Sequence, residues 1–247
     1  MKILLPLLLS AALVHAQTDD PPILKPALDS AEIESGGVPN EGTLPGEFSV
    51  RKGDGTISIV PSDRGTKVLK LEPTADASKE TLLLPCLVYR NMPEEFPNGV
   101  TFQARIKPDP AWQLPQTEIL SGRVSDRGTG MALSFRPTDR LVDVVSGSGD
   151  TEGDVWGIIS NLQAKITTDG WTHVAAVYDA EKKQFRLYFD GQMIAESATD
   201  LALTPMSKNL TIGAYRAGYT YPFRGEITDI AVYDYARSED QIQADAK

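Results

Sequence analysis

The chain of 247 residues carries a formal net charge of −10 at pH 7, and 41% of its residues are hydrophobic. This length accommodates one large β-domain or two small domains. Nucleic acids and anionic membrane surfaces are bound through basic patches, so the acidic balance argues against both as partners. The 20 glycines and 17 prolines indicate many turns rather than many helices.

Residues 1–16 have the pattern of an export signal. Lys2 supplies the positive start, residues 3–14 form a short apolar run, and Val14 and Ala16 are the small residues that a signal peptidase reads. The run is shorter than the roughly 20 residues of a membrane span. We therefore expect a secreted or periplasmic protein without membrane insertion, whose mature chain begins near Gln17. Removal of Lys2 lowers the formal charge from −10 to −11.

Residues 17–46 differ in composition from the rest of the chain. They are rich in Pro, Asp, Ser and Gly, with only scattered Ile and Leu. This composition predicts a poorly ordered leader or linker. The expected organisation is a signal peptide at 1–16, a leader at 17–46 and one domain at 47–247.

From residue 47 onward, short apolar stretches alternate with turn residues. Residues 171–178 are rich in β-branched and aromatic side chains, residues 185–189 alternate with a period of two, and Asp190-Gly191 suits a tight hairpin turn. Similar stretches occur at residues 48–51, 56–60, 67–71, 81–89, 100–106, 118–121, 131–135, 141–145, 157–162, 165–167 and 193–196. This rhythm, without a sustained helical period, predicts an all-β fold of two antiparallel sheets, a sandwich or jelly roll.

The last residues have a different character. Ser238 and Gln241 have the spacing of a capping box, and Glu239 and Asp240 lie between them in the expected first turn. We therefore expect a short C-terminal helix that begins at about Glu239.

The second half of the chain resembles a known family. The motifs W-T-H-V-A-A-V-Y-D, L-Y-F-D-G, L-T-I-G-A, F-R-G-E-I-T-D-I-A-V-Y-D and S-E-D-Q-I follow one another between Trp171 and Ile242. Their order and spacing resemble the laminin-G-like branch of the concanavalin A-like lectin/glucanase superfamily. The resemblance implies a two-sheet jelly roll and an exported, non-catalytic module that binds glycans or other proteins. Since enzymes share this scaffold, the fold alone does not establish the function.

Enzymatic motifs of the scaffold are incomplete. Family 16 glycoside hydrolases carry the pattern E-x-D-x-(x)-E, and the nearest match, Glu152-Gly153-Asp154, lacks the third acid. Residues 116–120 and 215–219 echo alginate-lyase motifs without their arginine, Gln-x-His and lysine. An alternative remains open, a glycoside hydrolase or polysaccharide lyase with an unfamiliar acid pair. Its candidate acids are Glu118, Asp126, Asp139, Asp143, Glu152 and Asp154.

The supply of histidine and cysteine is small. Cys86 is the only cysteine, and its apolar neighbours predict a buried, inert thiol. His173 is the only histidine of the mature chain and lies within an expected strand. A packed sheet histidine is therefore a better interpretation than a catalytic base, and a zinc site lacks ligands.

Calcium needs only oxygen ligands. The resemblance implies a structural calcium held by Asp229 of the last strand, with Glu47 as a companion. A hydrogen-bonded structural role for Asp229 is the alternative. Residues 214–219 contain no acid, so the calcium-mediated ligand binding of pentraxin-type relatives is not expected.

Aromatic side chains in loops are the candidate ligand-binding residues, because a ring face packs against the C–H face of a sugar. The candidates are Trp112, Trp156, Tyr215, Tyr219 and Tyr221, together with Arg216. The alternative is that half of these rings pack beneath their loops. Trp171 is expected in the core. We expect carbohydrate as the first choice of ligand and an extracellular protein surface as the second.

Overall fold

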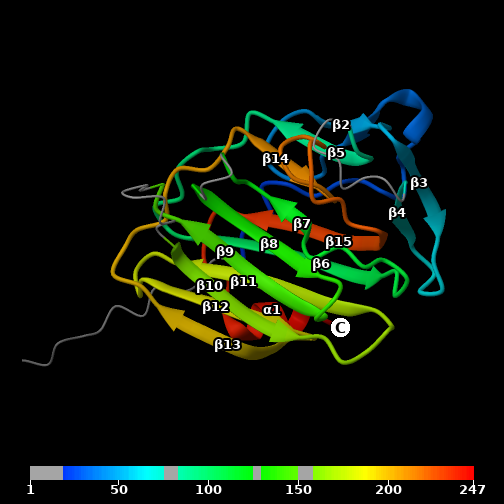
Figure 1. The fold of residues 1–247 in the computed structure, drawn as a ribbon. Coiled ribbons are helices and arrows are strands. Elements are labelled where there is room, and N and C mark those ends of the chain that lie inside the picture. Colours follow the sequence, from blue (N-terminus) through cyan, green and yellow to red (C-terminus); the bar gives the residue numbers. More distant parts are fainter. Residues whose placement is uncertain (1–18, 75–82, 125–128, 150–157) are drawn as a thin grey trace, which may run out of the picture.

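The computed structural model describes residues 19–74, 83–124, 129–149 and 158–247, the last range without the side chains of 158–161. Within these ranges, two antiparallel sheets of eight and seven strands stack face to face, and one short helix follows the last strand (Figure 1). The expected all-β jelly-roll sandwich with a C-terminal helix is confirmed. Among the described residues, no helix has the length and apolar character needed to cross a membrane.

The eight-stranded sheet carries the candidate site. Its strands lie in the order β1 (Gly37–Pro39), β2 (Glu47–Arg51), β5 (Cys86–Arg90), β14 (Asn209–Ile212), β7 (Thr117–Ser121), β8 (Gly130–Arg136), β9 (Leu141–Gly147) and β10 (Ile158–Lys165). The strand expected at 157–162 is seen from Ile158 and continues to Lys165, whereas residues 166 and 167 of the strand expected at 165–167 lie beyond it. A short 3₁₀ turn, η1 (Ile33–Ser35), precedes β1.

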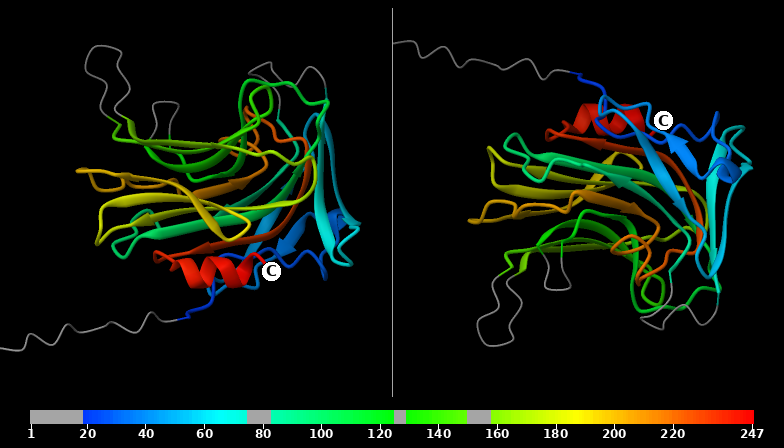
Figure 2. Two further views of the ribbon diagram at one scale, coloured as in Figure 1. Left: turned by 90° about the horizontal axis from the view of Figure 1, so that it is seen from below. Right: turned by 90° about the horizontal axis from the view of Figure 1, so that it is seen from above.

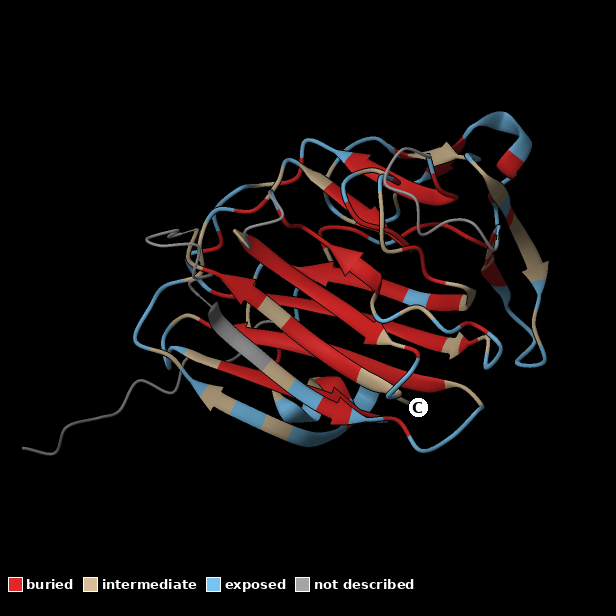
Figure 3. Cartoon of the chain, viewed as in Figure 1, coloured by how far each residue is buried: buried red, intermediate tan, exposed pale blue. Residues whose placement is uncertain are grey.

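The seven-stranded sheet lies behind it. Its order is β13 (Gln192–Ala198), β12 (Gln184–Phe189), β11 (Thr172–Asp179), β6 (Val100–Pro108), β15 (Gly225–Tyr233), β4 (Lys67–Pro73) and β3 (Gly55–Pro61). Figure 2 shows helix α1 (Glu239–Asp245) on the side of this sheet that faces away from the eight-stranded sheet. β13 is an exposed edge strand (Figure 3).

The core fills the space between the sheets because apolar residues recur at every second position of the strands. In β6, Phe102, Ala104 and Ile106 are buried in the main core cluster. The intervening Gln103 and Arg105 face α1 and bond to its last residues. The capping box that starts α1 is formed as expected, with the Ser238 hydroxyl accepting from the Gln241 amide.

The N-terminal segment differs from the leader expected at 17–46. From Asp19 on it is placed against the sandwich, and Ile23, Leu24 and Val38 are buried in the main core. Leu24 forms a β-bridge with Val232, where the Val232 amide donates to the Leu24 carbonyl at 2.9 Å. The physical reason lies in β15, which pairs with β4 only as far as Ile227. The segment supplies the missing partner for the second half of β15.

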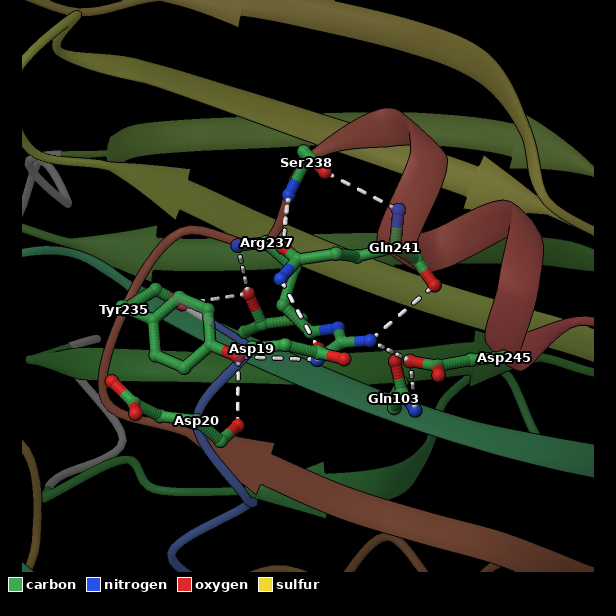
Figure 4. Close-up of polar contacts among 9 residues, drawn as sticks. Asp19, Asp20, Gln103, Tyr235, Arg237, Ser238, Gln241 and Asp245 are labelled. Carbon is green, nitrogen blue, oxygen red and sulfur yellow. Dashed lines mark hydrogen bonds and ion pairs between the residues drawn. The ribbon is translucent and has the colours of Figure 1, made fainter. Parts of the chain in front are cut away.

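Arg237 connects both ends of the chain (Figure 4). Its guanidinium lies 2.8 Å from the Asp245 carboxylate in α1 and 3.5 Å from the Asp19 carboxylate. The Tyr235 hydroxyl donates to the Asp20 carbonyl at 2.9 Å. The first described residues are thus fixed to the C-terminal helix, and the ordered domain begins well before residue 47.

Trp171 is the second departure from expectation. Its side chain is half-buried at the sheet end, its indole nitrogen donates to Asp63 at 2.8 Å, and the Lys107 ammonium lies 5.7 Å from the ring centre. The tryptophan precedes the first paired residue of β11, Thr172, so it lies beyond the core layer. It closes the end of the sandwich and does not belong to the core.

Replacing Leu24 by alanine tests the docking of the N-terminal segment. The side chain is 1% exposed, so its loss should lower the free energy of unfolding by about 2–4 kcal/mol in urea denaturation. The neighbouring Lys25→Ala, at an exposed position, is the matched control and should change it by less than about 1 kcal/mol. Equal stability of L24A and the wild type would contradict the docking.

Candidate functional site

A row of polar side chains crosses the outer face of the eight-stranded sheet. Glu118 of β7 pairs with Ser134 of β8, which pairs in turn with Asp143 of β9. The residues on either side of Ser134 and of Asp143 are buried in the main core. Because successive side chains of a strand point to opposite faces, the row faces away from the core. We call Glu118, Ser134 and Asp143 the polar row.

Glu118 is fully buried and doubly hydrogen-bonded. The Ser134 hydroxyl donates to its carboxylate at 2.9 Å, and the Arg123 guanidinium donates to the other oxygen at 3.2 Å. Burial nevertheless raises the pKa of the Glu118 carboxyl to about 7, against the opposing effects of Arg123 and Ser134. The Glu118 carboxyl therefore loses its proton less readily than an exposed glutamate does.

Asp143 lies at the other end of the row. One of its carboxylate oxygens is 2.9 Å from the Arg136 guanidinium, which also donates to Gln163 at 2.6 Å. The second oxygen is buried and has no hydrogen-bond partner among the residues that the structure describes. Burial raises the pKa of Asp143 to about 6 in spite of Arg136. Each acid of the row thus has its own arginine.

Residues 214–221 connect β14 to β15 and lie on the same face as the row. We call them the tyrosine loop. The Ala217 amide donates to the Thr211 hydroxyl at 3.0 Å, which folds the loop back onto β14. The Arg123 guanidinium lies 5.0 Å from the ring centre of the fully buried Tyr215, and the Glu118 amide donates to the Tyr221 carbonyl at 2.9 Å. The loop therefore packs against the polar row, which lies buried beneath it.

The loop adopts a backbone conformation that side chains disfavour. Arg216, Ala217 and Tyr221 have φ angles of 46°, 57° and 54°. Each costs about 1 kcal/mol relative to a right-handed conformation. Gly218 is required, because a Cβ at this position would lie 2.8 Å from the Leu84 carbonyl oxygen. The strain turns Tyr219 outward, and its side chain is 42% exposed.

Four of the expected ligand-binding residues come together in this loop. Tyr215 lies beneath it, and its ring centre is 5.9 Å from that of the half-buried Tyr221. Arg216 and Tyr219 are exposed, with the guanidinium 5.8 Å from the Tyr219 ring centre. Two of the tyrosine loop's three rings, Tyr215 and Tyr221, thus support it, and the outward-facing pair is Arg216 and Tyr219.

Trp112 is not available as a binding ring. Its side chain is 6% exposed, and its indole nitrogen donates to the Pro222 carbonyl at 3.0 Å. It packs with Cys86 and Ala214 in a small apolar cluster under the start of the tyrosine loop. The structure therefore gives Trp112 a supporting role instead of the expected contact with ligand. Trp156 and the acids Asp126, Glu152 and Asp154 lie outside the described residues.

The residues expected to hold calcium do not fit a shared site. Asp229 lies on β15 at a φ of 50°, and its carboxylate is 3.0 Å from the buried Arg105 guanidinium. Glu47 lies on β2 in the other sheet. A calcium ion on Asp229 would have to compete with a cation that is already there. Among the described residues, no group of three or more His, Cys, Asp or Glu side chains is placed to hold a metal ion.

Cys86 and His173 are confirmed as structural residues. Both are fully buried. Burial raises the pKa of the Cys86 thiol to about 12, so the reactive thiolate is absent at neutral pH. Burial, together with the nearby Arg105 charge, lowers the pKa of His173 to about 4. The imidazole is neutral at neutral pH and has no access to a substrate.

Sequence reasoning missed the arginines of the site. Arg123 and Arg136 pair with the two acids of the row, yet they stand in no recognisable motif. A weak signal was available in M-A-L-S-F and L-V-D-V-V, where Ser134 and Asp143 occupy the outward positions of two apolar strands. An acid at such a position marks a face that is not part of the core.

A model of the concanavalin A-like lectin/glucanases superfamily matches residues 89–243. The chain belongs to this superfamily. The match confirms the family inferred from the motifs at 171–242 and extends it to the strands of the polar row. No curated protein sequence matches the chain.

Solved structures share the fold of this superfamily member. The botulinum neurotoxin serotype D binding domain is similar with a TM-score of 0.65 and 12% identity, over 92% of this chain and 51% of that chain. The binding domain of botulinum neurotoxin DC in complex with rat synaptotagmin II gives 0.63 and 11%, over 91% and 50%. The Ruminococcus gnavus IT-sialidase CBM40 bound to α2,3 sialyllactose gives 0.47 and 19%, over 60% and 81%. The chain spans about half the length of the neurotoxin binding domains, and at these identities the likeness concerns the fold.

Removal of calcium tests the cation at Asp229. Because Arg105 occupies that position, we expect the same melting temperature with EDTA as with added CaCl₂. Arg105→Gln should lower the melting temperature in both buffers, since it leaves Asp229 and the Ala246 carbonyl without their partner. A melting temperature that falls only on chelation would show that the chain does hold structural calcium.

The stability of the protein should depend on pH through Glu118. A carboxyl whose pKa is raised on folding stabilises the fold fully below its unfolded pKa of about 4.5, and this contribution is lost as the pH rises through 7. Between pH 5 and pH 8, the free energy of unfolding measured in urea should therefore fall by about 2 kcal/mol more in the wild type than in Glu118→Gln. Glu34→Gln, at a side chain 88% exposed, is the control and should show no such difference. A constant difference between E118Q and the wild type at both pH values would contradict the raised pKa.

Proposed function

We propose that the protein is an exported, non-catalytic module that binds carbohydrate through the tyrosine loop, which the buried polar row supports from below. The observation that carries the proposal is the outward-facing pair Arg216 and Tyr219. An otherwise unfavourable backbone conformation holds this pair at the surface. Strained residues of this kind persist where the surrounding structure fixes them, and they cluster at binding sites.

The chemistry of the pair suits a sugar. The exposed Tyr219 ring offers a flat apolar face for the C–H side of a pyranose, while its hydroxyl and the Arg216 guanidinium offer hydrogen bonds to sugar hydroxyls. The buried Tyr215 below fixes the loop, so little backbone entropy is lost on binding. These features support shallow recognition at the rim of the eight-stranded sheet.

The two acids of the polar row support binding better than catalysis. Glu118 is completely buried and cannot touch a substrate in this arrangement. Two strand spacings separate it from Asp143, roughly 10 Å, whereas the two carboxyls lie about 5 Å apart in retaining glycosidases and about 6.5–9.5 Å apart in inverting ones. The pKa values of Glu118 and Asp143 are both raised. A catalytic pair needs one protonated and one ionised carboxyl, so its two pKa values are usually pushed apart.

The alternative is a glycoside hydrolase or polysaccharide lyase that uses the same row. The observation in its favour is that Glu118, with a pKa of about 7, and Asp143 share one face of the sheet. Incubation with laminarin, xylan, alginate and pectin, followed by assays for reducing ends and for unsaturated products, separates the two. We expect no turnover; activity that disappears in both E118Q and D143N would favour the enzyme.

Export and ligand class remain parts of the proposal. The pattern of residues 1–16 supports export. The similar neurotoxin binding domains have been determined with rat synaptotagmin II and with SialylT. A protein surface is therefore the second ligand class to test beside glycans.

A glycan array probed with the mature chain, followed by calorimetry with the strongest binder, tests the proposal. Tyr219→Ala should weaken binding up to about tenfold, since packing against an aromatic ring contributes about 0.5–1.5 kcal/mol beyond the area it buries. Arg216→Ala should weaken it as well, and Tyr219→Phe should retain most of the affinity. Met193→Ala, at an exposed side chain on β13 of the other sheet, is the matched control. Unchanged affinity in both Y219A and R216A would remove the tyrosine loop from the account.

A further inference from the structure

A cavity of about 390 Å³ lies at the opposite end of β14 from the tyrosine loop. Three connections meet there: the segment between β5 and β6, the turn between β11 and β12, and the segment between β13 and β14, which is orange in Figure 1. The volume falls within the range of roughly 300–1,000 Å³ that is typical of small-molecule sites. The cavity shares no residue with the polar row or the tyrosine loop.

The floor and walls of the cavity are apolar and fixed. Phe96 and Tyr178 form the floor, and both are nearly buried. The Tyr178 ring packs against Phe185 with the centroids 4.8 Å apart, and its hydroxyl accepts from the Leu203 amide at 3.2 Å. Gly99 lets the chain approach closely, because a Cβ there would lie 2.3 Å from the Tyr178 carbonyl oxygen. The cavity is therefore preformed and does not depend on a mobile wall.

Two opposite charges line the same cavity. They are Glu95, beside Phe96, and Lys183, in the turn between β11 and β12. Within the part of the chain that the structure describes, neither side chain has an ion-pair partner. Their immediate neighbours do, since Glu94 pairs with Lys208 at 3.4 Å and Lys182 pairs with Asp179 at 3.4 Å. Glu95 and Lys183 therefore place one carboxylate and one ammonium at the cavity that are not engaged in an ion pair within the described residues.

We infer that this cavity binds a short apolar peptide with free ends, of about two residues. The peptide ammonium would lie at Glu95, its carboxylate at Lys183, and its apolar side chains over Phe96 and Tyr178. Glu95 and Lys183 do not pair with each other, so a ligand that carries a positive and a negative end can engage both. Exposed ion pairs contribute little, so burial of the apolar side chains supplies most of the affinity.

Titration calorimetry of the mature chain with leucyl-phenylalanine tests the inference. We expect binding in the range of about 0.1–1 mM, weakened about threefold to fivefold by acetylation of the peptide amine or amidation of its carboxyl. Glu95→Gln should weaken binding of the free peptide and leave the acetylated peptide unaffected. Lys183→Gln should weaken binding of the free peptide and leave binding of the amidated peptide unaffected.

Glu94→Gln and Lys182→Gln are the matched controls and should bind the free peptide like the wild type. Ala202→Phe, at an exposed position that lines the cavity, should abolish binding without unfolding the protein, as checked by its melting curve. The inference is overturned if leucyl-phenylalanine does not bind at 5 mM, or if the blocked and free peptides bind equally well. Glycan binding by the tyrosine loop is measured separately, so either site can fail without the other.

Discussion

The candidate site depends on the alternation of side chains along three strands of one sheet. In β8 and β9, Leu133, Phe135, Val142 and Val144 enter the core, and this fixes Ser134 and Asp143 on the opposite face. A shift of one residue would turn Ser134 of β8 or Asp143 of β9 into the core and expose an apolar residue. The cost of such a shift holds the polar row in register, and the row in turn fixes Arg123 beneath the tyrosine loop.

The outer face is held together by charges that are paired before any ligand arrives. Arg123 neutralises Glu118 and supports the Tyr215 ring, so one side chain joins the sheet to the loop. Arg136 pairs with the Asp143 carboxylate in the same way. Buried pairs of this kind add little net stability, because the desolvation of both ions offsets their attraction. Their contribution here is geometric, since they orient the surface beneath the exposed Arg216 and Tyr219.

The sequence sufficed for the fold and for the residues of the loop, because both signals are local. The alternation within β12, the Asp190-Gly191 turn and the capping box at Ser238 can each be recognised within a few residues. The arrangement of the polar row could not be found this way. Glu118 and Asp143 are aligned only because their strands pair with β8 on either side of Ser134. The N-terminal segment was missed because its apolar residues are few, although nearly all of them are buried. Sequence patterns predicted Trp112 at the surface and Trp171 in the core, whereas the structure buries Trp112 and leaves Trp171 half-buried. Both residues lie just beyond a strand, and the ends of strands are the least certain part of a sequence-based assignment.

The central claim is that ligand binds on the outer face of the eight-stranded sheet, at the tyrosine loop. The most direct measurement is a ¹H–¹⁵N NMR titration of the mature chain with an oligosaccharide of the best-binding glycan. The account predicts that the largest shift changes occur in the backbone amides of residues 214–221, with smaller ones at Glu118, Arg123 and Ser134. Shift changes confined to the outer face of the seven-stranded sheet, around α1, would contradict it.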